Sequence, residues 1–106
     1  MRADVEGIAA ARGVDADWTT RYDTPAAVLD ATLRGRLAAA VRDLGLPVRE
    51  LVSGAGHDAV VLSRICPAAM LFVRCAEGIS HDPRESVSEE DVAVALDVLE
   101  RAVRAS

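Results

Sequence analysis

The chain has 106 residues, of which 51% are hydrophobic and 3% aromatic, so it can form one small domain at most, with a core of Ala, Val, Leu and Ile. Its formal net charge of −5, with no basic cluster, argues against binding to nucleic acid, which requires lysine and arginine patches. The longest apolar run, at 68–73, is far shorter than the roughly 20 residues of a membrane span, and residues 1–14 lack the apolar core of a signal peptide, so we expect a cytoplasmic protein that does not enter the membrane.

The first predicted elements are a helix and a strand. Residues 2–12 place Val5, Ile8 and Ala9 on one helical face, and Gly13 is a suitable C-terminal stop. Residues 15–22 alternate between polar side chains and apolar or aromatic ones, which is the period of a half-buried strand. Because two elements cannot bury each other's apolar faces alone, we expect residues 1–22 to be the end of a larger unit.

A second helix is predicted from Ala31 to Leu44. Asp30 can cap it by accepting hydrogen bonds from backbone N–H groups. Gly45 can end it, and Pro47 prevents its continuation. Its apolar stripe consists of Leu33, Leu37, Val41 and Leu44.

The remaining elements alternate between strand and helix. A short strand at 49–52 precedes a glycine loop, a helix is predicted at 57–65, and the apolar run at 68–73 is typical of a strand covered on both faces. Ser88 can cap a last helix, whose stripe consists of Val92, Leu96, Leu99 and Val103. This order favours an α/β fold with a mostly parallel sheet.

Two loops contain both histidines of the chain. The first reads Ser-Gly-Ala-Gly-His-Asp-Ala over residues 53–59. Gly54 and Gly56 permit a positive φ and a close approach of the backbone to a ligand. The N–H groups of a helix that begins near Gly56 would favour an anion such as a carboxylate. An ordinary strand-to-helix turn would show the same pattern.

The second loop reads Gly-Ile-Ser-His-Asp-Pro-Arg-Glu over residues 78–85. Pro83 restricts the backbone two residues after His81, whose imidazole would suit zinc. Glu85 could orient such a ligand through a hydrogen bond. A surface histidine in a turn is the alternative. Cys66 and Cys75 match no CxxC spacing and are expected to be free thiols.

Taken together, these motifs occur in one order with tight spacing. The set resembles the C-terminal part of the M20-type zinc amidohydrolases, in the group of allantoate amidohydrolases and N-carbamoyl-L-amino-acid hydrolases. The resemblance covers nearly the whole chain. It is carried by Ser53 to Ala59, Cys66-Pro67, Phe72-Val73, and Gly78-Ile79-Ser80-His81 with Pro83 and Glu85.

This resemblance implies a fold and an activity. Residues 23–106 would be the C-terminal part of a zinc-exopeptidase-like α/β catalytic domain. Residues 1–22 would be the last helix and strand of the inserted dimerisation, or lid, domain. Full-length members of the family form homodimers and hydrolyse non-peptide C–N bonds of small ureido and carbamoyl substrates at a two-metal centre.

The resemblance also implies roles for single residues. His81 would be a ligand of zinc, manganese or another divalent metal. Asp58 and Glu85 would be supporting carboxylates near the two histidines. The candidates for contact with the substrate are Gly54, Ala55, Gly56 and His57.

The other metal ligands of this family have no counterpart in the chain. A first histidine, a bridging aspartate, paired glutamates and a further histidine are lacking, as are the substrate-binding asparagine and arginine of the lid. We therefore expect a fragment that is inactive alone and needs the N-terminal part of the enzyme, and no choice among the substrates follows. The alternative is a small stand-alone α/β binding or interaction module without catalysis.

Overall fold

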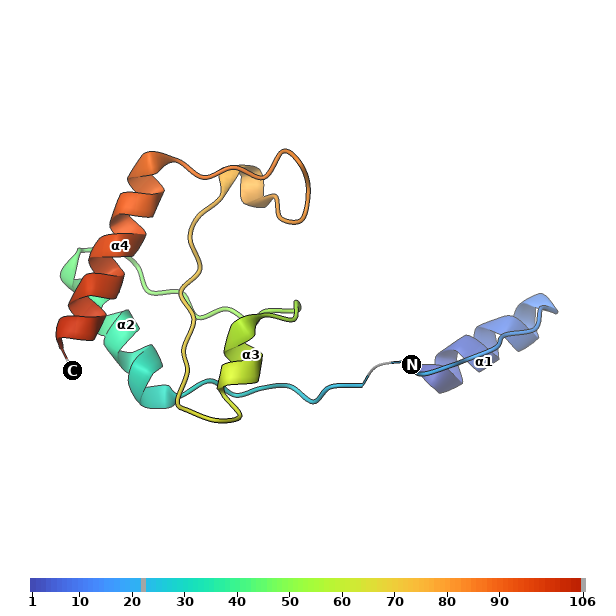
Figure 1. The fold of residues 1–106 in the computed structure, drawn as a ribbon. Coiled ribbons are helices and arrows are strands. Elements are labelled where there is room, and N and C mark those ends of the chain that lie inside the picture. Colours follow the sequence, from blue (N-terminus) through green and yellow to red (C-terminus); the bar gives the residue numbers. More distant parts are fainter. Residues whose placement is uncertain (22, 106) are drawn as a thin grey trace.

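The computed structural model describes residues 1–21 and 23–105, which form helices joined by long segments without regular structure (Figure 1). None of these helices could cross a lipid bilayer. The elements in chain order are α1 (Arg2–Arg12), α2 (Ala31–Asp43), α3 (Asp58–Leu62), the 3₁₀ helix η1 (Ala76–Gly78) and α4 (Glu89–Arg104).

Capping interactions set the ends of the three longer helices. α1 ends at Gly13, which adopts a left-handed φ of 64°. α2 begins where the Asp30 carboxylate accepts a hydrogen bond from the Leu33 N–H at 2.8 Å. α4 begins where the Ser88 hydroxyl accepts one from the Asp91 N–H at 3.1 Å. These three helices confirm the predictions at 2–12, at 31–44 and after Ser88, whereas the helix predicted at 57–65 forms only over Asp58–Leu62. Each N-terminal side-chain cap stabilises its helix by about 1 kcal/mol.

The core lies between α2 and α4, which pack against each other (Figure 1). Ala40 of α2 is 3% exposed and Val98 of α4 is 2% exposed. The predicted stripe of α2 is half-buried at this contact. Because few large side chains are enclosed, the described residues form only a small core.

The face of α4 that packs on α2 differs from the predicted one. Val98 is buried, and Ala95 and Ala102 beside it are half-buried, whereas Leu96 is 61% exposed and Val103 is 70% exposed. At 3.6 residues per turn, these two sets lie on adjoining faces of the helix. The prediction failed because α4 carries two apolar faces and α2 covers only one of them.

No strand is present in residues 1–21 and 23–105, so the strands predicted at 15–22, 49–52 and 68–73 are not formed there. Tyr22 itself lies outside the described residues. A strand is held by hydrogen bonds to a neighbouring strand, and these segments have none. The α/β arrangement of a complete domain is therefore neither supported nor contradicted by this chain alone.

α2 nevertheless contacts both central segments that were predicted as strands. The Arg34 guanidinium donates a hydrogen bond to Glu50 at 3.1 Å. The Asp30 N–H donates to the carbonyl of Ala68 at 2.8 Å. A helix that contacts two extended segments in this way is compatible with one layer of an α/β fold.

The N-terminal arm, defined as residues 1–21, stands apart from the other helices (Figure 1). After Gly13 the chain runs back along α1, and the Val14 N–H donates to the carbonyl of Ala9 at 3.1 Å. Ala9 is the buried residue of this arm. The arm thus has almost no core of its own.

The molecule is less compact than a globular domain of the same length. Its accessible surface is 8799 Å², whereas a compact monomer of this size exposes about 5,700 Å². Its radius of gyration is 19.3 Å, against about 13 Å for a compact domain. The excess of about 3,100 Å² is as large as an obligate protein interface.

The small core allows a direct test. We expect Val98→Ala to destabilise the packing of α2 on α4 by about 2 kcal/mol, because it leaves a cavity at the most buried side chain. Val103→Ala is the matched control, since it removes the same atoms from an exposed position of α4. Urea unfolding followed by circular dichroism measures both, and equal effects would contradict this packing.

Candidate functional site

Two loops contain the candidate site residues. We call residues 53–59 the His57 loop and residues 76–86 the His81 loop. In Figure 1 both project from the side of the molecule away from α2 and α4. The His57 loop leads into α3, and the His81 loop leads into α4.

The His81 loop is closed at its base. The Ala76 N–H donates a hydrogen bond to the carbonyl of Ser86 at 2.8 Å. Inside this closure, η1 makes the first turn, with the Gly78 N–H donating to the Cys75 carbonyl at 3.2 Å. The loop therefore keeps its two ends together through its own backbone.

His81 adopts a left-handed backbone, with a φ of 59°. For a residue other than glycine this conformation costs about 1–2 kcal/mol. The His81 N–H donates to Oε2 of Glu85 at 3.0 Å. In turn the Glu85 N–H donates to the Asp82 carbonyl at 2.9 Å. The Glu85 carboxylate thus holds the backbone of His81, whereas the sequence had suggested that it orients the imidazole.

Asp82 and Arg84 form a second local pair in this loop. Oδ1 of Asp82 accepts hydrogen bonds from both the backbone N–H and Nε of Arg84, each at 2.9 Å. Both hydrogen bonds lower the pKa of the Asp82 carboxyl, and the bond from the Arg84 side chain has the larger effect. The same pair raises the pKa of Arg84. Asp82 is therefore ionised at neutral pH and is engaged by Arg84.

Sequence reasoning did not identify Arg84. The signal available was its position two residues after an aspartate and directly after a proline, which is a turn sequence. In such a turn the aspartate carboxylate accepts from the backbone N–H two residues later. A long cation at that position can then reach the same carboxylate.

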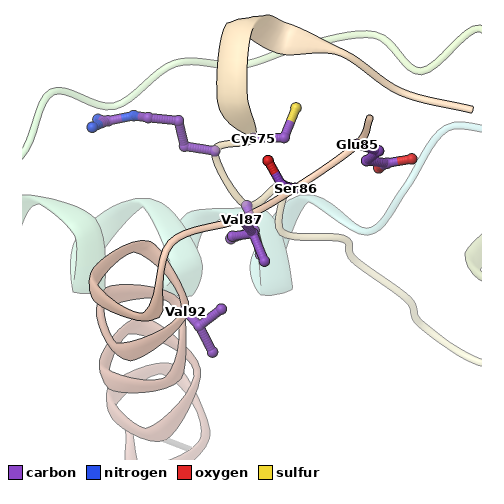
Figure 2. Close-up of a pocket in the computed structure, with 7 residues that line it drawn as sticks. Cys75, Glu85, Ser86, Val87 and Val92 are labelled. Atoms are coloured by element: carbon purple, nitrogen blue, oxygen red, sulfur yellow. The ribbon is translucent and has the colours of Figure 1, made fainter. Parts of the chain in front are cut away.

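A cavity of about 290 Å³ lies between the base of the His81 loop and the first turn of α4 (Figure 2). None of the predicted substrate-contact residues lines it. It is lined by Val73, Arg74, Cys75, Glu85, Ser86, Val87 and Val92. Cys75 and Cys66 are both free thiols, as predicted.

The His57 loop has an open surface. Neither Gly54 nor Gly56 has a positive φ, and no atom beyond the adjacent residues lies within 4 Å of the position that a Cβ would take at either glycine. The Ala55 N–H donates to Oγ of Ser53 at 3.3 Å, which forms a local turn. The internal packing of the described residues therefore gives no reason for glycine at these two positions.

His57 precedes α3 as its N-terminal flanking residue, with φ −153° and ψ 166°. Its Nδ1 atom is buried and has no hydrogen-bond partner. The helix begins at Asp58 rather than near Gly56 and has only five residues. Asp58 also places a negative charge in its first turn. The expected attraction of an anion to this helix terminus is therefore not supported.

The two loops do not form a metal site within residues 1–21 and 23–105. Those residues contain no group of three or more His, Cys, Asp or Glu side chains placed to hold a metal. His81 is exposed and supplies one imidazole. Because a catalytic zinc site needs about three protein ligands, these residues alone do not fit the metal centre that the resemblance implies.

Comparison with known proteins settles the family. The model of "Peptidase family M20/M25/M40" matches residues 3–105. The chain belongs to this family. The match covers nearly all of the N-terminal arm, both histidine loops and α4, so the family pattern includes all of these segments.

Curated relatives of this M20 chain carry amidohydrolase names. A "Probable allantoate deiminase" of Oryza sativa subsp. japonica is 44% identical over 84 residues, which are 79% of this chain and 16% of that protein. An "N-carbamoyl-L-amino acid amidohydrolase" of Geobacillus stearothermophilus is 48% identical over 64 residues, 60% of this chain and 16% of that protein. A "Ureidoglycolate hydrolase" of Arabidopsis thaliana is 37% identical over 75 residues, 71% of this chain and 16% of that protein.

The matched part is a small share of these relatives. In each of the three the aligned region is 16% of the relative's own length. The chain thus spans about a sixth of the curated proteins it matches. The names of the relatives describe proteins about six times longer than the segment that is shared.

Proposed function

We propose that the chain is the C-terminal portion of a metal-dependent amidohydrolase that hydrolyses C–N bonds of N-carbamoyl amino acids, allantoate or related ureido compounds. The observation that supports this most is the family match over residues 3–105 together with relatives named for such substrates. By itself the chain is inactive, because it supplies one ligand to a centre that needs several.

The uncovered apolar surface supports a place inside a larger domain. Leu96 and Val103 form an exposed apolar face on α4, and the segments 49–52 and 68–73 lack strand partners. A sheet from the rest of the catalytic domain would pair with these segments and cover that face, giving the α/β fold. A stand-alone binding module would leave the same surface in water, which makes it the weaker proposal.

The division into domains is part of the same proposal. Residues 1–22 would belong to the dimerisation or lid domain, and residues 23–106 to the catalytic domain. The separation of the N-terminal arm from α2 and α4 supports a boundary near residue 22 (Figure 1). The full-length enzyme would be a cytoplasmic homodimer.

Within that enzyme the two loops would have different roles. The exposed imidazole of His81 would be one ligand of zinc, manganese or another divalent ion. Gly54, Ala55 and Gly56 would form one wall of the substrate pocket, because the open space beside them admits a ligand. His57 beside them, at the start of α3, would contact the substrate. Asp58 would be the supporting carboxylate beside it.

A chimera tests the proposal. The region of the Geobacillus stearothermophilus amidohydrolase that corresponds to residues 3–105 in the family pattern is replaced by those residues. The chimera and the isolated 106-residue chain are then assayed for hydrolysis of an N-carbamoyl-L-amino acid and for bound zinc. We expect turnover and stoichiometric metal in the chimera and neither in the isolated chain. Turnover by the isolated chain, or a folded chimera without activity, would contradict the proposal.

A further inference from the structure

We propose that Glu85 is a positioning residue whose carboxylate fixes the left-handed backbone of His81 and thereby sets the direction in which the imidazole leaves the loop. The inference rests on the proposed function only in that His81 is taken as a metal ligand. The contact itself is a property of this chain: the His81 N–H donates to Oε2 of Glu85 at 3.0 Å.

The backbone of His81 requires such support. Its φ of 59° lies in the left-handed region, which residues with a side chain rarely adopt. A conformation of this kind persists where surrounding interactions hold it, and such conformations cluster at functional sites. A charged acceptor makes a stronger hydrogen bond than a neutral one.

Glu85 is itself held where it can make this contact. Its N–H donates to the Asp82 carbonyl at 2.9 Å, and Pro83 between them restricts the turn. Arg84 clamps Asp82 through two bonds of 2.9 Å to one carboxylate oxygen. The backbone on the far side is closed by the bond between Ser86 and Ala76. The turn therefore carries the Glu85 side chain back to the N–H of His81.

The consequence for His81 is geometric. The Cα–Cβ bond projects from the backbone in a direction that φ determines, so a change of His81 to negative φ would turn the imidazole away from its present direction. Metal ligation tolerates only small displacements of a ligand atom. Glu85 thus acts on the ligand through its main chain, and another group must fix the rotation of the ring.

Nuclear magnetic resonance of the 106-residue chain tests this directly. The readouts are the backbone couplings of His81 that report φ and the hydrogen-exchange rate of its N–H. We expect Glu85→Ala to speed exchange of this N–H at least about fivefold and to shift the couplings toward negative φ, because the acceptor is lost. Glu85→Gln keeps an acceptor oxygen and should preserve the positive φ. Glu90→Ala, at an exposed carboxylate of α4, is the control.

The outcomes separate this inference from the proposed function. An unprotected His81 N–H in the unaltered chain, or unchanged couplings in Glu85→Ala, would overturn the positioning role whether or not the chimera is active. In an active chimera, Glu85→Ala should weaken zinc binding about 10–100-fold, with Glu85→Gln restoring most of it. Equal losses in both variants would show that the carboxylate charge, not the backbone bond, is what matters, and would also overturn the inference.

Discussion

His81→Ala in the chimeric amidohydrolase is expected to reduce kcat/KM by at least about 100-fold and to lower its zinc content. Loss of groups that only orient a metal ligand already costs about 10–100-fold in affinity or activity, so loss of a ligand costs at least as much. The exposed imidazole has no structural role within the described residues, and its removal should leave the unfolding of the chimera nearly unchanged. Steady-state kinetics and metal analysis of the purified protein measure these effects.

His57→Ala provides the comparison within the same chimera. Its partly buried ring flanks α3, in the loop that the resemblance assigns to the substrate rather than to the metal. We expect full zinc content and a raised KM. If His81→Ala kept its metal and its activity while His57→Ala lost the metal, the assignment of the two histidines would be reversed.

Leu96→Glu is expected to prevent assembly of the chimera while leaving the isolated chain unaffected. Leu96 is exposed in the isolated chain, so a carboxylate there remains in water. Under the sheet of a complete domain the same carboxylate would be buried without a partner, at a cost of several kcal/mol. Circular dichroism of the isolated chain, and soluble yield and activity of the chimera, give the two readouts.

Ala93→Glu is the matched control for this substitution. It introduces the same side chain into α4 on the charged side of the helix, where it is exposed. The chimera should tolerate it. An active, stable chimera carrying Leu96→Glu would show that nothing covers this face, and would remove the structural support that the face gives to a larger domain around it.

The helices were predictable because their signals are local. Asp30 and Ser88 cap α2 and α4 through bonds to residues three positions away, and Gly13 ends α1. No distant part of the protein is needed for these contacts. The strands were not realised for the opposite reason, since residues 49–52 and 68–73 depend on partners from elsewhere, as every strand does.

The site was predictable as motifs and not as geometry. The motif at residues 78–85 was part of the predicted resemblance to the M20 family, and the match of the family model confirms that resemblance. The motif did not indicate the hydrogen bond from the His81 N–H to the Glu85 carboxylate, because this contact depends on a left-handed φ that histidine rarely adopts. The packed face of α4 was also missed. The helix has two adjoining apolar faces, and hydrophobic periodicity does not tell which of them packs against α2.

The closed base of the His81 loop has a consequence for the order of folding. The hydrogen bonds described above for this loop join residues at most ten positions apart, from Ala76 to Ser86. Contacts of such short range close in much less time than the pairing of distant strands. The His81 loop would therefore be shaped before a surrounding sheet assembles, and the rest of the domain would form around a His81 backbone already in its left-handed conformation.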